Sequence, residues 1–162
     1  MPRKLTRGEV DRLLAERRVA VLGTRASDGR AMLAPIWYVH RDGKILMRTA
    51  QDSLKAAHIR RDPRVTVCVQ DERAPYKSVT VYGTAVVAPS EKGLDVRMAR
   101  RYLGFVGGFF YLQGARRAVE QGATEVTLVV TPERFVTQDF SPETPRVGKL
   151  WLLAKRVLPP WL

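Results

Sequence analysis

The chain has 162 residues, of which 45% are hydrophobic, a length and composition typical of one folded domain with a sizeable core. Its formal net charge of +12, from 28 lysines and arginines against 16 acidic residues, indicates an anionic partner such as nucleic acid, acidic lipid or a phosphorylated ligand. The single cysteine, Cys68, excludes an intrachain disulfide framework and a cysteine-built metal site. It fits a reducing compartment, and its apolar surroundings predict a buried, unreactive thiol.

The first predicted element is a helix over residues 6–18. Thr6 and Glu9 have the spacing of a capping box, and apolar residues follow them at helical intervals. This charged N-terminal stretch lacks the apolar centre of a secretory signal, and no apolar run in the chain is long enough to span a membrane. We therefore expect a cytoplasmic protein.

A strand over residues 19–26 follows the helix. The next two strands lie within residues 31–50 and fold back on each other at Asp42-Gly43, a strong hairpin signal. A short helix over residues 53–61 comes next, and Asp62-Pro63 ends it because the residue before a proline is pushed out of the helical region.

The second half of the chain begins with strands over residues 64–71 and 78–89. Ser90 is the expected cap of a helix that the three glycines of GFVGGFFYLQG interrupt, and a second helix is expected over about residues 109–121. The glycines allow either a mobile lid or a tight corner between helices. A strand over residues 124–140 closes the domain.

These elements add up to about six strands and three or four helices, without a regular β-α-β alternation. We therefore expect a mainly β fold with helices, of the α+β class: a six-stranded antiparallel barrel that occupies residues 1–140. Residues 141–162 form a tail rich in tryptophan and proline, expected to pack on the surface or at a dimer interface. Contact between this tail and a membrane surface is the less favoured alternative.

Residue patterns for catalysis by the protein alone are missing. The sequence has no nucleophile elbow and no phosphate-binding glycine loop, and His40 and His58 lack metal-ligand spacing with acidic partners. Each histidine is better explained as a surface residue or a hydrogen-bonded structural one. An enzyme with this sequence would therefore draw its reactivity from a cofactor.

The segment RTAQDSLK places Arg48, Thr49, Ser53 and Lys55 where a strand ends and a helix begins. The start of a helix offers unpaired N–H groups and a positive dipole, and nearby hydroxyl and cationic groups could complete a phosphate site. The alternative is structural: Ser53 would only cap the helix, and Lys55 and the arginines that follow would form a solvated face.

The run APIWYVHRDGKILMRTAQDSLKAAHIRRDPRVTVCV resembles the pyridoxamine 5'-phosphate oxidase-like, FMN-binding split-barrel superfamily. It is most similar to the F420-dependent flavin/deazaflavin oxidoreductases (B type) of that superfamily. In those proteins a proline and a tryptophan precede a DG hairpin, a strand ending in threonine, a helix opening with S-x-K, and RRDPRV before the next strand. This chain has each of these features, and the resemblance extends over about residues 8–140.

The resemblance implies an FMN-binding type of split barrel that forms a homodimer, with two cofactors bound at the interface between the subunits. It also implies which residues bind the cofactor: Ala34, Pro35, Ile36 and Trp37 along the tricyclic ring, Arg48, Thr49, Ser53 and Lys55 around the phosphate, and Lys77 and Ser78 as a polar pair. In the FMN oxidases a glutamine stands at the position of Ser78, so this chain is a poorer match to FMN oxidase chemistry. The resemblance assigns no catalytic residue.

We expect coenzyme F420 as the cofactor, with FMN as the alternative, because F420 carries a longer run of negative charge that suits the positive surplus. The expected reaction is hydride transfer from reduced F420 to an unsaturated, small organic acceptor that the sequence does not identify. Tyr38, Tyr76 and His40 are candidate proton donors.

Two further hypotheses remain open. The protein could be an FMN-binding oxidoreductase or a flavin-binding protein of the same superfamily. It could also be a basic nucleic-acid-binding protein. The scattered charge and the absence of an RNA-recognition motif argue against nucleic acid, so we expect no such partner.

Overall fold

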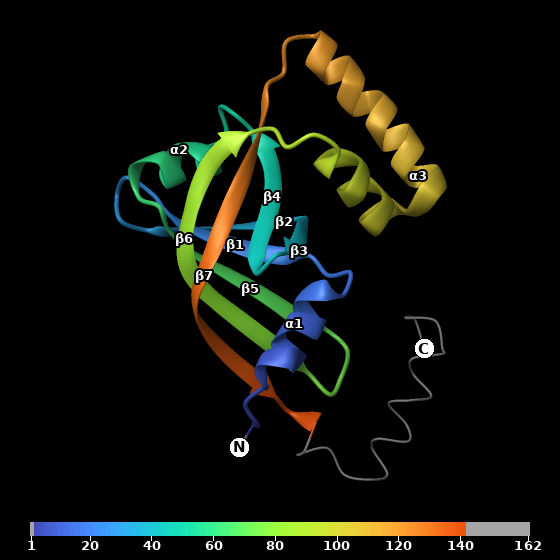
Figure 1. Cartoon of the computed structure of the whole chain (residues 1–162). Helices are drawn as coiled ribbons and strands as arrows, with labels where there is room; N and C mark the ends of the chain where they lie inside the picture. Colours follow the sequence, from blue (N-terminus) through green and yellow to red (C-terminus); the bar gives the residue numbers. More distant parts are fainter. Residues whose placement is uncertain (1, 142–162) are drawn as a thin grey trace.

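The computed structural model describes residues 2–141, apart from the side chain of Ala118 (Figure 1). The strands are β1 (Ala20–Arg25), β2 (Ala31–Ile36), β3 (Tyr38–Arg41), β4 (Lys44–Ala50), β5 (Arg64–Asp71), β6 (Lys77–Pro89) and β7 (Glu125–Asp139). The helices are α1 (Arg7–Ala15), α2 (Leu54–Arg61) and α3 (Leu94–Glu120). The tail expected over residues 142–162 lies outside the described residues.

All seven of these strands belong to one antiparallel sheet, in the order β2-β1-β5-β6-β7-β4-β3. The two strands at its edges, β2 and β3, are consecutive in the chain and are separated only by Trp37. The sheet must therefore curl until its two edges come together at Trp37, although β2 and β3 do not pair with each other. The result is a barrel that is split along one line.

The expected number of six strands is wrong, because the single strand predicted before Asp42-Gly43 is divided at Trp37. On one side of this residue, Ile36 pairs with Ala20 of β1, and on the other side Tyr38 pairs with Met47 of β4. These partners belong to opposite edges of the sheet, so the chain changes partner where it passes Trp37. The α+β class of the fold is confirmed.

The core fills the inside of the curled sheet. In β5, Val65, Val67 and Val69 are buried and their neighbours are not, as the alternation predicts. Burial of a side chain of this size contributes roughly 1.5–3 kcal/mol. Cys68 lies on the other face of β5 and is half-buried, so the prediction of a buried thiol is wrong.

Local capping signals identify the first two helices correctly. The Thr6 side chain accepts a hydrogen bond from the backbone N–H of Glu9, and the Glu9 carboxylate accepts one from Thr6, so the predicted capping box is present. The helix α1 ends at Ala15, three residues earlier than predicted. Ser53 caps α2 as expected, and its side chain accepts a hydrogen bond from the backbone N–H of Ala56.

The helix α3 begins later than predicted, at Leu94, and Ser90 is not its cap. The preceding residue, Gly93, adopts a left-handed conformation with φ of 77°. The chain turns first because the Glu91 backbone N–H donates to Thr127 of β7, and the Leu94 N–H donates to the Glu91 carbonyl. These bonds hold residues 91–93 against the sheet, so the helix can start only after them.

The glycine-rich part of α3 forms a tight corner. Only Gly104 leaves the helical conformation, with φ of 70° and ψ of −167°, and Figure 1 shows the two helical stretches meeting at a bend. Beyond the bend, a Cβ placed on Gly108 would lie 3.2 Å from the Ala99 carbonyl carbon. The second stretch therefore packs against the first through the absence of a side chain at Gly108.

No helix within residues 2–141 is both long enough and apolar enough to cross a membrane.

Candidate functional site

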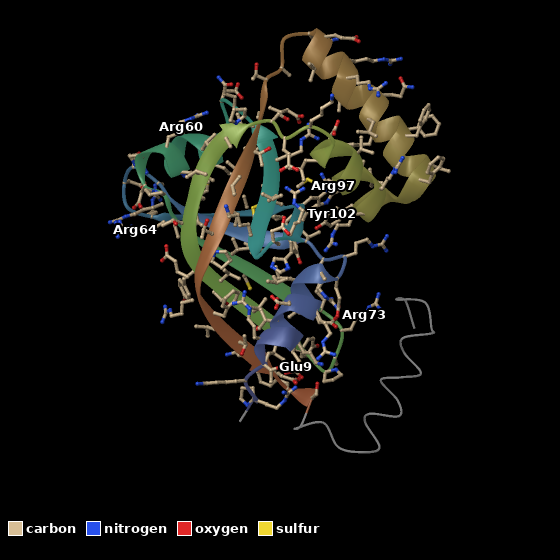
Figure 2. The ribbon with its side chains drawn as sticks, in the orientation of Figure 1. Glu9, Arg60, Arg64, Arg73, Arg97 and Tyr102 are labelled. Atoms are coloured by element: carbon tan, nitrogen blue, oxygen red, sulfur yellow. The ribbon has the colours of Figure 1, made fainter. Side chains whose placement is uncertain are left out.

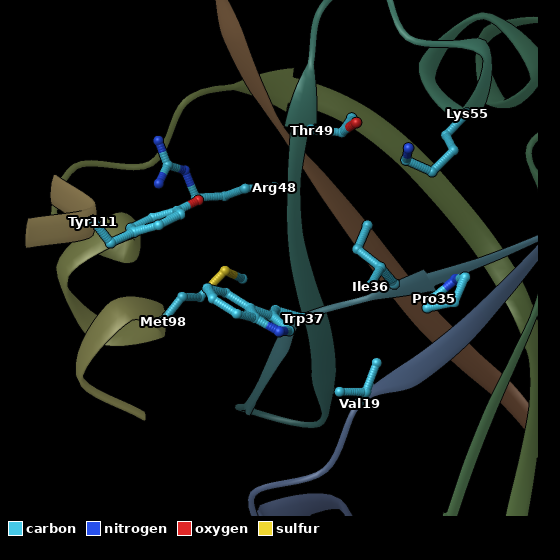
Figure 3. Close-up of a pocket in the computed structure, with 9 residues that line it drawn as sticks. All are labelled: Val19, Pro35, Ile36, Trp37, Arg48, Thr49, Lys55, Met98 and Tyr111. Atoms are coloured by element: carbon cyan, nitrogen blue, oxygen red, sulfur yellow. The ribbon is translucent and has the colours of Figure 1, made fainter. Parts of the chain in front are cut away.

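A cavity of about 430 Å³ opens at the split in the barrel (Figure 3). Its lining residues come from the residue before β1, the β2–β3 junction, β4, α2 and α3: Val19, Pro35, Ile36, Trp37, Arg48, Thr49, Lys55, Met98 and Tyr111. Six of these nine belong to the residue set that the resemblance implies. The fold thus brings the segment around Trp37 and the end of β4 to one place.

Trp37 forms one wall of the cavity, and Tyr102 of α3 holds it there. The two rings are stacked, with centroids 4.8 Å apart and an angle of 2° between their planes. The Tyr102 hydroxyl accepts a hydrogen bond from the Tyr38 backbone N–H at 3.1 Å and donates one to the Arg18 carbonyl at 2.7 Å. Because β2 and β3 do not pair with each other at this point, Tyr102 supplies hydrogen bonds across a gap that the sheet does not close.

Two cations line the cavity at different places: Figure 3 shows the Arg48 guanidinium on the side of Tyr111 and Lys55 on the side of Thr49. The Arg48 guanidinium forms an ion pair with Glu125 of β7, and its Nε is buried without a hydrogen-bond partner in the described part of the chain. Lys55 lies in the first turn of α2, a turn without acidic residues. Within residues 2–141 the Lys55 ammonium has no ion-pair partner, so of the two cations in the cavity lining it is the one more available to a ligand.

Thr49 and Ser53 connect the end of β4 to the start of α2. The Thr49 hydroxyl donates to the Ser53 Oγ at 3.0 Å, and the Ala56 backbone N–H donates to the same oxygen at 3.3 Å. Thr49 lines the cavity, but Ser53 does not. In this chain Ser53 therefore acts as a helix cap that also supports Thr49. Ala34, another residue of the set that the resemblance implies, also lies outside the cavity lining.

Lys77 and Ser78 lie elsewhere, at the beginning of β6. They line a second cavity of about 390 Å³ together with residues such as Asp71 and Gln138. The ladder between β6 and β7 runs from Lys77, opposite Asp139, to Pro89, opposite Val126. Since β4 pairs with the Val126 end of β7, the first cavity and the Lys77–Ser78 pair lie at opposite ends of this ladder.

None of the three candidate proton donors lines the first cavity. Tyr38 is fully buried, and burial raises the pKa of its hydroxyl. His40 is half-buried in β3, and this burial lowers its pKa. Tyr76 lines the second cavity.

The other histidine, His58, is a satisfied structural residue. It is buried in α2 and lies within hydrogen-bond distance of the Thr24 hydroxyl, with 3.1 Å between Nδ1 and Oγ1. Residues 2–141 contain no cluster of histidine, cysteine and carboxylate side chains that could hold a metal ion.

The positive charge outside the cavity is dispersed. Figure 2 shows Arg60 and Arg64 at one side of the barrel and Arg73 near its other end. Several of the cations are neutralised locally, for example Arg64 by Asp62 at 2.8 Å and Arg41 by Glu91 at 2.8 Å. Over residues 2–141, such a distribution does not form the continuous basic face typical of nucleic-acid-binding proteins.

The sequence did not identify Val19, Met98 and Tyr111 as site residues. Met98 and Tyr111 lie on either side of the Gly104 bend, so helical periodicity cannot place them on one face. The one local signal was Gly104 followed by the Gly107-Gly108 pair, which marked a bend without giving its direction.

Solved structures with the same fold include several relatives. A conserved hypothetical protein from Mycobacterium tuberculosis is 24% identical, with a TM-score of 0.68, over 88% of this chain and 90% of that one. An F420 reductase is 21% identical, with a TM-score of 0.62, over 78% and 94% of the two chains. An FAD-binding protein from Mesorhizobium loti is 22% identical, with a TM-score of 0.61, over 86% and 96%. At these identities the likeness establishes the fold class, the split barrel.

A family model described as pyridoxamine 5'-phosphate oxidase matches residues 6–138, which include all the residues that line the cavity and the described strands except Asp139, the last residue of β7. The chain therefore belongs to the pyridoxamine 5'-phosphate oxidase family. A search of the curated proteins finds no significant match to this chain.

Proposed function

We propose that the protein is an oxidoreductase that transfers a hydride from reduced coenzyme F420 to an unsaturated organic acceptor. The observation that carries this proposal is the composition of the first cavity. An apolar and aromatic wall, Pro35 to Trp37, faces a group of hydrogen-bond donors on Arg48, Thr49 and Lys55. A flavin or deazaflavin coenzyme has the same two parts, a flat ring and an anionic phosphate.

The donor set fits a phosphate group. A guanidinium, a hydroxyl and an ammonium all donate hydrogen bonds, and charge-assisted bonds of this kind are the strong ones. The unpartnered Nε of Arg48 and the unpaired ammonium of Lys55 both retain donor capacity. The N-terminus of α2 adds the positive end of a helix dipole beside Lys55.

The protein's own contribution is to bind and orient. Lys55 and Arg48 would hold the coenzyme by its anionic part, and the Pro35–Trp37 segment would support its ring. The buried side chains of Ile36, within this segment, and Tyr38, next to it, would limit the access of water to the reacting face. The coenzyme itself supplies the hydride.

We favour coenzyme F420 over FMN because of the charge near the cavity. F420 has a polyglutamate extension that needs further cations, and the exposed Arg60 and Arg61 follow Lys55 on the same short helix. The F420 reductase with the same fold agrees with this choice. FMN remains the second candidate, because a single phosphate would satisfy Arg48, Thr49 and Lys55.

We also propose that the working protein is a homodimer with the coenzyme at its interface. Lys77 and Ser78 lie at the far end of the β6–β7 ladder from the first cavity of their own chain. They can reach a coenzyme in that cavity only if they belong to a second copy. Each binding site would then combine Arg48 and Lys55 of one subunit with Lys77 and Ser78 of the other.

Parallel titrations with coenzyme F420 and FMN test the proposal. The purified protein is expected to be colourless and to change the fluorescence of added F420 on binding, with a lower affinity for FMN. A protein that is yellow as purified, with a flavin spectrum and no affinity for F420, would contradict the choice of F420 and support FMN. Binding of neither coenzyme would contradict the proposed function as a whole.

A further inference from the structure

The part of the first cavity that lies away from Lys55 is mainly aromatic, and the proposed coenzyme contacts leave Met98 and Tyr111 in it unexplained. Trp37, Met98 and Tyr111 form most of this part, two of them from α3, and Figure 3 shows the Arg48 guanidinium on the same side of the cavity as Tyr111. Among residues 2–141, no carboxylate side chain lines the cavity. We propose that this surface, the aromatic subsite, binds the acceptor, and that the acceptor is an uncharged molecule with a flat unsaturated ring.

The aromatic subsite has its shape before a ligand binds. Tyr102 covers one face of the Trp37 indole at 4.8 Å and so fixes the plane of that ring. The Tyr111 ring meets Trp37 at a centroid distance of 5.5 Å and an angle of 50°. The two rings are in contact and both line the cavity, so they present one continuous aromatic surface before a ligand binds.

The surface chemistry of the subsite selects a flat ring. Aromatic side chains gain stacking and edge-to-face contacts with planar rings beyond the gain from burial alone. The Met98 thioether adapts to irregular shapes and makes favourable contacts with aromatic rings. A puckered saturated ring of the same size would touch these surfaces at fewer points.

The charges in the cavity exclude charged acceptors. Its charged lining residues are the cations Arg48 and Lys55, and these are the proposed holders of the coenzyme phosphate. A cationic acceptor would be repelled by them, and an anionic one would compete with the coenzyme for the same groups. An uncharged acceptor avoids both effects.

The position of Tyr111 depends on the two glycines at the bend of α3. Gly104 has φ of 70° and ψ of −167°, a backbone conformation that a residue with a side chain rarely adopts. Gly108 lets the second stretch of α3 approach Ala99 of the first. Together they return the helix toward the barrel so that Tyr111 reaches Trp37.

The role of this subsite as an acceptor site rests on the proposed function, whereas its affinity for flat rings does not. The test therefore measures binding directly, with two uncharged probes of similar size: naphthalene-2-carboxamide, which is flat, and its decahydro analogue, which is puckered. Calorimetric titrations use the full chain with and without added coenzyme F420. We expect the flat probe to bind about fivefold more tightly in at least one of these two states.

Variants localise the effect. Tyr111→Ala should reduce the preference for the flat probe to about twofold or less, and Tyr111→Phe should retain it. Phe110→Ala is the matched control, because this neighbouring ring is 69% exposed and does not line the cavity. Equal binding of the two probes, undetectable binding of the flat probe, or an unchanged preference in Tyr111→Ala would each overturn the proposal.

The same titrations separate this inference from the proposed function. A preference for the flat probe in a protein that binds neither F420 nor FMN would overturn the proposed function and leave the aromatic subsite supported. Binding of F420 without any preference between the probes would support the proposed function and overturn the aromatic subsite.

Discussion

The indole ring of Trp37 stacks on the phenol ring of Tyr102, with centroids 4.8 Å apart and planes only 2° from parallel. The hydroxyl of the same tyrosine bridges the backbone of Tyr38 and Arg18 across the split of the barrel. One side chain of α3 therefore holds both the ring that lines the cavity and the backbone on which that ring is mounted.

This dual role predicts different effects for two changes of Tyr102. Tyr102→Phe keeps the stacked ring but leaves the Tyr38 N–H and the Arg18 carbonyl without this partner, so the free energy of unfolding should fall by about 1–2 kcal/mol. Tyr102→Leu also removes the stack, and should in addition weaken coenzyme binding. Urea denaturation and coenzyme titration measure the two effects, and a Tyr102→Phe variant as stable as the parent protein would show that the bridge contributes nothing.

The cationic part of the cavity predicts a loss of affinity in Lys55→Ala. Loss of its charge-assisted hydrogen bond should weaken coenzyme binding by about 1–3 kcal/mol, and added salt should reduce the difference between variant and parent. Lys44→Ala is the control, because Lys44 begins β4 and does not line the cavity. An unchanged affinity in a folded Lys55→Ala variant would refute the phosphate site.

The separation of Lys77 from the first cavity predicts a subunit effect. Lys77→Ala should weaken coenzyme binding although Lys77 does not line the cavity of its own chain. Light scattering should give a mass twice that of the 18.3 kDa chain. Lys92→Ala, a change of another lysine outside both cavities, should leave binding as it is. A monomeric protein that binds the coenzyme normally would contradict the shared site.

The β6–β7 ladder predicts that Gly83 cannot be replaced. At the irregularity between Tyr82 and Gly83, a Cβ on Gly83 would lie 2.2 Å from the backbone oxygen of Thr131. Gly83→Ala should therefore destabilise the fold by about 1–3 kcal/mol or more. Gly114→Ala is the contrasting control: its Cβ would meet nothing within 4 Å, and alanine in a helix interior should stabilise by roughly 0.5–1 kcal/mol. Thermal unfolding of both variants checks the sign of each change.

The ion pair between Arg3 and Asp139 predicts a loss of stability in acid. Arg3 donates to the buried Asp139 carboxylate at 2.6 Å. Burial by itself would raise the Asp139 pKa, but hydrogen bonds from Ser141 and Arg3 outweigh it and lower that pKa below the ordinary value of 3.8. As the pH falls below about 4, Asp139 therefore takes up a proton in the unfolded state before it does so in the folded state. The stability that the ionised Asp139 carboxylate contributes is lost as the pH falls further through its folded-state pKa.

Asp139→Asn is the matched variant for this acid effect. It should lower stability at pH 7 and should show a smaller further loss between pH 5 and about 2 than the parent protein. Denaturation with urea at several pH values gives both quantities. Parallel stability curves for the two proteins over this range would contradict a role for the Asp139 carboxylate.

Sequence reasoning succeeded where a feature depends on neighbours in the chain. The capping box of Thr6 and Glu9 and the cap at Ser53 are formed as predicted. Asp42 and Gly43 adopt φ of 52° and 70°, as a two-residue hairpin turn requires. The meeting of the Trp37 segment with Arg48, Thr49 and Lys55 came from the family pattern, and the structure brings these residues together.

Sequence reasoning failed where contacts between distant parts of the chain determine the structure. The apolar run through Trp37 has no local signal for a break, because the break arises when β2 and β3 pair with opposite edges of the sheet. The late start of α3 depends on a hydrogen bond from Glu91 to Thr127, a residue of β7. Tyr111 becomes a site residue only through the backbone angles of Gly104 and the contact at Gly108.

The helix α3 leaves the sheet and returns to it at a single place. Its connections begin after Pro89 and end before Val126, and these two residues are partners at the root of the β6–β7 hairpin. An inserted segment whose two ends lie next to each other can be exchanged or remodelled without changing the strands that it connects. The proposed coenzyme-binding residues, Pro35 to Trp37, Arg48, Thr49 and Lys55, lie in the barrel and α2, whereas Met98 and Tyr111 belong to α3. Evolution or an engineer could therefore change the substrate preference through α3 while coenzyme binding is kept.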